Sequence, residues 1–318
     1  MSLSGAAGLV LARPARLLGV EPFFGEFIAG MEERLAERGI SVLFHVVTTH
    51  EEEITTYRRW AARSLVDAVA LVNLTAGDRR PAVLRELGLP TVIVGDWQER
   101  QPGVAAVPTD DYQPMREAFT RLYALGHRRI ARVTGPAELL HTRTRTRALL
   151  DCGREAGVEP VLVEGDYSAE SGARATAELL NRAQRPTAIV YDNDVMAVAG
   201  LDAAKRLRVP VPDELSLLAW DDSTMCQLAS PPLSAMRGDT YQYGMSVAQS
   251  ALELIDRGEA ARRWAPALGF IGRGTTAAPP GGPAATKEAA VEHGERPAGR
   301  PEAAEAERPG AGSAESAG

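Results

Sequence analysis

The sequence predicts an α/β fold in which helices cover both faces of parallel sheets. Three observations predict it. Short β-rich apolar runs alternate with helical stretches, polar residues follow the ends of these runs, and 45% of the 318 residues are apolar. Such alternation joins parallel strands through right-handed helical crossovers. For a chain of this length, we expect two lobes.

Eight apolar runs are the candidate strands, at residues 7–12, 42–47, 68–72, 91–94, 130–134, 161–164, 188–191 and 215–220. Candidate helices lie at residues 23–38, 51–64, 112–125, 141–156, 169–184, 195–207 and 240–257. The first helix shows the periodicity best, because Phe24, Ile28, Met31 and Leu35 form one apolar stripe that ends at Gly39.

The late helix at residues 240–257 carries apolar side chains on two faces. One face holds Met245, Ala248, Leu252 and Ile255, and the other holds Val247, Ala251 and Leu254. Two apolar faces indicate burial on two sides. We interpret this as contact with the helix's own lobe and with a partner subunit.

Composition and missing motifs favour a binding function over catalysis. The net charge of −7 makes the chain a poor nucleic-acid binder by itself. Phosphate-loop, dinucleotide-fingerprint, zinc-protease and serine-elbow motifs are all missing, and the five histidines show no metal-ligand spacing. Cys152 and Cys226 show no redox spacing. We therefore expect no catalysis, cofactor or metal.

The ends of the chain support two further predictions. Its start lacks a basic segment and a long apolar run, so we expect a cytoplasmic protein with no membrane partner. After residue 276 the composition changes to Ala, Pro, Gly and Glu with almost no large apolar side chains. Such a segment cannot offset its ordering entropy, so residues 277–318 are expected to be a disordered tail.

Polar side chains collect where four apolar runs end. These clusters are Asp110-Asp111, Asp166-Tyr167, Asp192-Asn193-Asp194 and Asp221-Asp222. Helix capping explains any one of them, and we expect Asp194 and Asp222 to be caps or turn residues. Four clusters at the carboxyl ends of strands favour a ligand site instead, because ligands bind at that edge of open parallel sheets.

Two other features leave alternatives open. Phe23 lies beside the Phe24 stripe near a helix start, where it either stacks on a planar or sugar-ring ligand or closes the core. On a helix, Arg143 and Arg147 share one face, and Arg145 points roughly the other way. Only one of these two groups is therefore expected to face the cleft. Spacing alone does not decide between them.

An ordered series of segments resembles the lactose-repressor/galactose-repressor (LacI/GalR) family of bacterial transcription regulators, from about residue 8 to residue 276. The segments include Pro22-Phe23-Phe24, Gly126-His127-Arg128, Gly165-Asp166-Tyr167-Ser168, Asn193-Asp194-Val195-Met196-Ala197, Pro212-Asp213-Glu214-Leu215-Ser216 and Pro231-Pro232-Leu233. The resemblance implies a periplasmic-binding-protein-like fold: two Rossmann-like lobes joined by three crossings, near residues 110, 237–240 and 264–268. The first lobe then comprises residues 5–109 and 240–264, and the second comprises residues 110–239 and 265–276.

The resemblance also implies which residues contact an effector. They are Phe23, Phe24, Asp110, His141, Arg145, Tyr167, Asn193 and Asp221. The two phenylalanines match an aromatic pair on the first lobe, and Asp110 matches an aspartate at the first crossing. Arg145 matches the arginine that typically holds the ligand. The other four match polar or stacking contacts from the second lobe.

The resemblance implies the ligand-sensing and dimerisation region of a DNA-binding regulator, acting as a repressor. The effector is expected to be a sugar or related polyol, with a purine-like ligand as the second choice, and the partner a second copy of the chain. In this family a helix-turn-helix headpiece binds operator DNA. The residues before Gly8 are expected to be too few to form it. Glu21, the basic loop at residues 13–20 and Thr240 depart from the family pattern near the cleft. The alternatives are a periplasmic sugar-binding protein of a transporter and a nucleotide-dependent enzyme, which needs a glycine loop that is not found.

Overall fold

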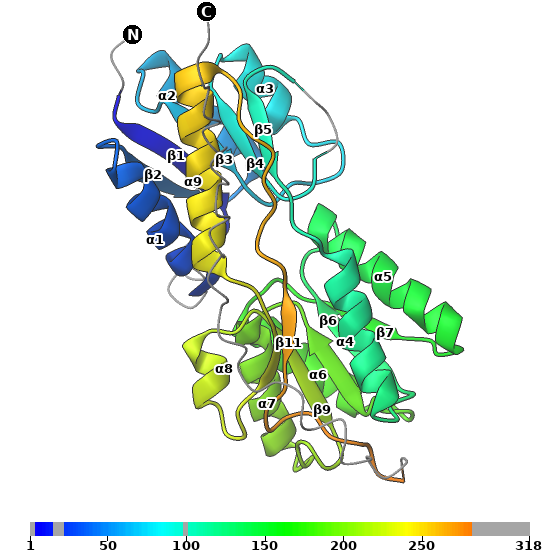
Figure 1. The fold of residues 1–318 in the computed structure, drawn as a ribbon. Helices are drawn as coiled ribbons and strands as arrows, with labels where there is room; N and C mark the ends of the chain where they lie inside the picture. The colour runs from blue at the N-terminus through cyan, green and yellow to red at the C-terminus, as the bar shows by residue number, and fades with distance from the viewer. Residues whose placement is uncertain (1–3, 15–21, 98–100, 282–318) are drawn as a thin grey trace, which may run out of the picture. The chain divides into compact units, whose positions relative to one another are not determined.

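The computed structural model describes residues 4–14, 22–97 and 101–281, and two sheets organise this part of the chain (Figure 1). The first sheet contains β1 (Ala6–Ala12), β2 (Ser41–Val47), β3 (Ala68–Leu71), β4 (Thr91–Val94) and β5 (Val104–Val107). The second contains β6 (Ile130–Thr134), β7 (Val161–Glu164), β8 (Ala188–Tyr191), β9 (Ser216–Trp220), β10 (Ser234–Arg237) and β11 (Gly269–Ile271). The predicted α/β class with parallel sheets in two lobes is confirmed.

Both sheets repeat one strand order. The first runs β2-β1-β3-β4-β5, and the second runs β11-β10-β9-β8-β6-β7, so that β7-β6-β8-β9-β10 follows the same pattern. All of these pairings are parallel, and the β10–β11 pairing is antiparallel. This order is the doubly wound arrangement in which the chain turns outward from its first strand in both directions.

Helices cover both faces of each sheet. In the first lobe, α1 (Pro22–Ala36) and α9 (Thr240–Arg257) pack on one face, and α2 (His50–Ala62) and α3 (Arg80–Glu86) pack on the other. In the second lobe, α4 (Tyr112–Ala124) and α5 (Leu140–Ala156) lie opposite α6 (Ala169–Leu180), α7 (Asp194–Arg206) and α8 (Thr224–Leu228). Along β8, Ala188 and Val190 enter one core and Ile189 and Tyr191 enter the other, as a strand buried on both sides requires.

The chain passes between the lobes three times: after β5, after β10, and between α9 and β11. The family resemblance implies crossings near residues 110, 237–240 and 264–268. The residue bounds of the two lobes remain a prediction.

The second apolar face of α9 has a partner within the chain. The residues of that face, Val247, Ala251 and Leu254, are buried and belong to the first-lobe core, and α9 lies beside α1 (Figure 1). A Cβ added at Gly30 of α1 would lie 2.0 Å from the Tyr241 carbonyl oxygen, so glycine permits this close helix contact. Packing against the sheet and α1 therefore accounts for the two apolar faces of α9 within one chain, and the predicted subunit contact at this helix stays a prediction.

Short elements escaped the sequence prediction. Among the described residues these are α3, α8, β5, β10 and β11. The predicted tail also begins too early. Ala277 exchanges backbone hydrogen bonds with the Ser216 hydroxyl, and its carbonyl lies 2.9 Å from the His127 ring, so this residue belongs to the second lobe. The rest of the tail prediction, from residue 282, lies outside the described residues. Within the described ranges, no helix combines the length and apolar character of a membrane span.

Candidate ligand-binding site

A cavity of about 150 Å³ lies where the carboxyl ends of the two sheets meet. The first lobe contributes residues that follow β1, β3 and β4, among them Arg13 and Asn73. The second lobe contributes residues that follow β8 and β9, among them Asn193 and Asp221. β1 and β3 are the strands at which the chain reverses its winding direction, and ligands bind at this position in doubly wound sheets. The topology therefore places a binding cavity here.

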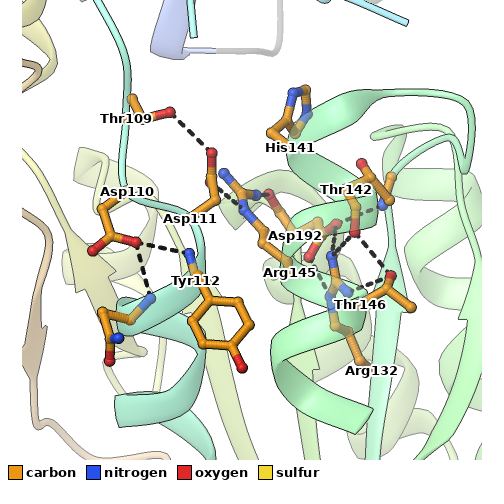
Figure 2. A network of polar contacts seen from close by, with 12 residues as sticks. Thr109, Asp110, Asp111, Tyr112, Arg132, His141, Thr142, Arg145, Thr146 and Asp192 are labelled. Carbon is orange, nitrogen blue, oxygen red and sulfur yellow. Dashed lines mark hydrogen bonds and ion pairs between the residues drawn. The ribbon is translucent and has the colours of Figure 1, made fainter. Parts of the chain in front are cut away.

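Arg145 of α5 is the central cation of the cavity wall (Figure 2). Its Nε donates to Asp111 Oδ1 over 2.7 Å, and its guanidinium carbon lies 4.1 Å from the centre of the Trp220 ring. Burial is the largest single influence on the pKa of Asp111 and raises it, but the charge of Arg145 and the hydrogen bonds with Arg145 and Thr109 together lower this pKa, so the carboxylate stays ionised. The pair fixes a guanidinium at the first crossing between the lobes.

A second, deeper pair supports the first. Asp192 accepts two hydrogen bonds from Arg132, at 2.7 and 2.6 Å, and a third from the Gly135 amide. The side chains of Arg132 and Asp192 are fully buried, and the Asp192 carbonyl accepts a bond from Arg145. Burial raises the pKa of Asp192, yet the two arginines lower it overall. Figure 2 shows Asp111, Arg145, Asp192 and Arg132 in one network.

Tyr167 and His141 form a neutral wall. The His141 Nε2 lies 2.7 Å from the Tyr167 hydroxyl, and both residues line the cavity. Burial, together with the charge of Arg145, lowers the pKa of His141 to about 4, so its ring is neutral at pH 7. Burial raises the pKa of Tyr167. The ring of Tyr167 packs on Gly135, where an added Cβ would lie 2.2 Å from the tyrosine Cζ.

Asn193 and Asp221 stand at two adjacent strand ends. The Asn193 side chain accepts from the Met196 amide at 2.9 Å, which caps α7, and it donates to the Tyr167 carbonyl. Asp221 has a left-handed backbone with φ 68° and lines the cavity beside Trp220. Its turn directs the chain from β9 to the cavity edge.

Aromatic rings form the first-lobe side of the cavity. Phe23 is half-buried and stacks on Phe27, while Phe24 is buried at the start of α1. The Arg13 guanidinium lies 4.6 Å from the centre of the Tyr167 ring and 5.7 Å from that of Phe24. Arg13 therefore joins aromatic residues of the two lobes across the cavity.

One expectation about capping and one about the first crossing need correction. Asp110 does not line this cavity: it is exposed and accepts the backbone N–H groups of Tyr112 and Gln113, which caps α4. Its neighbour Asp111 takes the place at the cavity. Asp194 does not cap α7, because Asn193 does. Asp222 lies in the connection between β9 and α8, which agrees with the turn alternative, and it pairs with Arg273. Consecutive residues at a helix start point in different directions, which is why the sequence misassigned them.

The structure thus brings seven of the eight predicted residues together at one cavity: Phe23, Phe24, His141, Arg145, Tyr167, Asn193 and Asp221. Arg143 and Arg147 are exposed and lie outside it. Sequence reasoning missed Arg13, Asp111 and Trp220. Arg13 directly follows β1 and Trp220 ends β9, and Asp111 belongs to the predicted polar cluster that comes after β5; these positions were the available signal. The departure at Thr240 lines the cavity, whereas Glu21 and residues 15–20 lie outside the described residues.

The polar groups at the cavity suit binding more than metal chemistry. In the described part of the chain, no cluster of three or more His, Cys, Asp or Glu side chains could hold a metal ion. The carboxylates of Asp111 and Asp192 are neutralised by arginines, and the histidine is neutral. The arrangement offers fixed hydrogen-bond donors and acceptors beside aromatic faces.

Comparisons with known proteins agree with this geometry. A family model described as a periplasmic binding protein-like domain matches residues 119–276. The transcriptional regulator CelR of Thermobifida fusca is 32% identical over 258 residues, which cover 78% of this chain and 73% of CelR. The repressor CytR of Escherichia coli K12 is 29% identical over 74% of this chain and 69% of its own.

Solved structures extend the match. A LacI family transcriptional regulator from Bifidobacterium animalis subsp. lactis is 34% identical, with a TM-score of 0.79, over 87% of this chain and 100% of that one. CelR in complex with cellobiose is 27% identical, with a TM-score of 0.78, over 86% of this chain and 85% of its own.

The two sheets of repeated strand order, with a polar cavity at their carboxyl ends, define a periplasmic-binding-protein-like binding domain. The chain belongs to the LacI family of transcriptional regulators, and the described residues form its ligand-binding domain. The relatives are regulators and not enzymes.

Proposed function

We propose that the cavity binds a small polar effector, a sugar or related polyol, and that its binding controls how the complete regulator binds operator DNA. One observation carries the proposal: Arg145 is fixed at the cavity wall by Asp111 and Trp220. Two of its five N–H groups bond protein acceptors among the described residues, which leaves donors for a ligand. Carboxylates, an amide and aromatic rings surround it, and this mixture suits a hydroxylated ring.

Similarity to CelR supports a sugar, because that relative is described in complex with cellobiose. The residues expected to contact the ligand come from both lobes, and this suggests how ligand binding could regulate the protein. Phe23 and Phe24 come from the first lobe, and Arg145, Asn193 and Asp221 from the second. A ligand that contacts both lobes favours one arrangement of them, and this population shift changes operator affinity if the regulator is a dimer. The homodimer stays a prediction, for which light scattering after gel filtration gives the test.

Thermal unfolding in the presence of single sugars tests the proposal. A ligand at 100 times its Kd stabilises the folded state by about 2.7 kcal/mol. We expect at least one of glucose, galactose, cellobiose and maltose to raise the Tm of the parent chain. Arg145→Ala and Asp221→Ala should abolish the rise, and Arg154→Ala, which changes an exposed arginine of α5 outside the cavity lining, should retain it. If both cavity variants respond like the parent, the site assignment is wrong.

A further inference from the structure

A second cavity continues the first. It has a volume of about 800 Å³, and the two share the residues Val94, Gly95, Thr109, Asp111 and His141 as a common wall. Beyond this wall the second cavity extends between the end of β4, the start of α5 and the third crossing. A ligand seated against His141 and Asp111 is therefore adjacent to both cavities.

The sizes of the two cavities matter for the ligand. Sites for drug-sized molecules typically measure about 300–1,000 Å³. The first cavity, at about 150 Å³, is below this range and suits one small ring. The second, at about 800 Å³, has room for more than one. A ligand with several rings would fill both, whereas a single ring leaves the second cavity to water.

Two tryptophans line the second cavity. Trp264 lies in the third crossing and is 54% exposed, although large aromatic side chains are usually covered. Trp97 follows β4, and its buried Nε1–H has no hydrogen-bond partner among the described residues. Indole offers a flat apolar face for stacking and one N–H donor. The apolar face can stack on the C–H face of a sugar ring, and the N–H group can donate to one of its hydroxyl groups.

The charges at the second cavity favour a neutral ligand. Arg143 and Arg147 supply two exposed cations, and Asp96 and Asp110 supply two exposed carboxylates. The third carboxylate, Asp111 of the shared wall, is already paired with Arg145. The exposed arginines donate hydrogen bonds and the exposed aspartates accept them in equal number. This balance suits the hydroxyl groups of a neutral ligand, which both donate and accept hydrogen bonds. An anionic ligand would instead need an excess of cations.

We propose that the second cavity is a subsite for the further rings of a neutral oligosaccharide effector, with one ring stacked on Trp264. The first ring occupies the cavity at Arg145, so this inference rests on the proposed function. The effector class is then an oligosaccharide of two or three units, and Trp264 is the residue that selects it over a monosaccharide.

Isothermal titration with ligands of increasing length tests the subsite. The ligands are glucose, cellobiose and cellotriose, with maltose and maltotriose as a second linkage. We expect the parent chain to bind a longer member at least about tenfold more tightly than glucose. Trp264→Ala should reduce that affinity to within about twofold of the value for glucose and leave the glucose affinity unchanged. Trp264→Phe should retain most of the gain, because it keeps a stacking face.

Leu228→Ala is the matched control, because it removes an apolar side chain that is 79% exposed on α8, away from both cavities. Equal affinity of the parent for glucose and the longer sugars would overturn the subsite and leave the proposed function intact. The same conclusion follows if Trp264→Ala weakens glucose and the longer sugars equally. If no sugar of either series binds, both the sugar effector and the subsite are wrong.

Discussion

Each lobe buries arginine–carboxylate pairs near the carboxyl ends of its sheet, and the two networks face different surroundings. In the first lobe, Arg80 lies between Glu53 and Asp78, and all three side chains are at most 2% exposed. Arg80 also donates to the Asn73 carbonyl, and Glu53 accepts from the Ala12 amide. These bonds fix the ends of β3 and β1, and none of the three charged residues lines the cavity.

In the second lobe, the pairs Arg132–Asp192 and Arg145–Asp111 stand in line toward the cavity. The inner pair is fully buried, and the side chains of the outer pair are 11% and 8% exposed. Arg145, Asp111 and Asp192 line the cavity. The same chemistry therefore serves two purposes. In the first lobe, protein groups surround the arginine and the pairs stabilise the fold. In the second lobe, one side of the arginine is open to the cavity, so it can donate hydrogen bonds to a ligand.

The largest expected effect is on stability in the first lobe. Arg80→Met leaves Glu53 and Asp78 buried without their cation, so we expect the free energy of unfolding to fall by about 3–5 kcal/mol. Urea denaturation measures it. The adjacent Arg79 pairs with Glu51 at the surface, where both side chains are about 70% exposed. Arg79→Met should cost less than about 1 kcal/mol. Equal losses in the two variants would contradict the scaffold role of Arg80.

The second expected effect is a dependence on pH at the cavity. Burial lowers the pKa of His141 to about 4, against about 6.5 in the unfolded chain. Between these values the unfolded state binds more protons, so the free energy of unfolding falls as pH falls from about 6.5 to 4 and is constant above. We expect this residue to contribute about 2–3 kcal/mol to that fall.

His127 has the same lowered pKa, about 4, from burial at the far end of the second lobe. His141→Gln should therefore remove only part of the pH dependence, and the double variant with His127→Gln most of it. Denaturation at pH 7.5 and pH 4.5 measures both. An unchanged slope in His141→Gln would contradict a neutral, buried ring at the cavity.

The third effect concerns the wall behind the ligand. Gly135→Ala forces the Tyr167 ring toward the cavity, because the new Cβ would lie 2.2 Å from the ring. We expect a loss of about 1–3 kcal/mol in the free energy of unfolding, and weaker effector binding. Gly25→Ala on α1 is the control: its Cβ meets nothing within 4 Å, and helix propensity predicts a gain of up to about 1 kcal/mol. A tolerated Gly135→Ala would show that the ring is not fixed there.

The smallest effect concerns a direct backbone contact between the lobes. Leu140, the first residue of α5, donates its N–H to the Leu74 carbonyl over 2.9 Å, and Leu139 forms a bridge with Thr75. Proline fits the first position of a helix but lacks this donor. We expect Leu140→Pro to unfold about 1 kcal/mol more easily than Leu140→Ala, which keeps the donor. Identical stabilities would mean that the contact contributes nothing.

The fold was largely predictable because its signals are local. The alternation of apolar runs and amphipathic helices identified most strands, and burial on both sides of β8 follows from its continuous apolar run. Elements such as β11, with three residues, and β10, with Ser234 and Arg237, are too short or too polar for that pattern. Tertiary pairing, and not propensity, makes them strands.

The site was predictable in part for a similar reason. Strand ends locate the cavity, which is how Asn193 and Asp221 were found. Which of two neighbouring side chains faces it depends on helix starts that sequence spacing does not resolve. Asp110 caps α4, and so Asp111 meets Arg145. The role of Arg13 in the cavity could not be predicted, because its contact with Tyr167 joins positions far apart in the sequence.

Titration of the sugar that most stabilises the chain into three proteins tests the central claim most directly. These are the parent, Arg145→Met and Arg80→Met, each at a temperature where it is folded. The loss of charged hydrogen bonds predicts a Kd roughly 100-fold weaker in Arg145→Met. Arg80→Met should keep its Kd within about threefold of the parent despite its lower stability. An unchanged Kd in Arg145→Met, or equal weakening in both variants, would contradict the division between a scaffold network and a ligand-binding one.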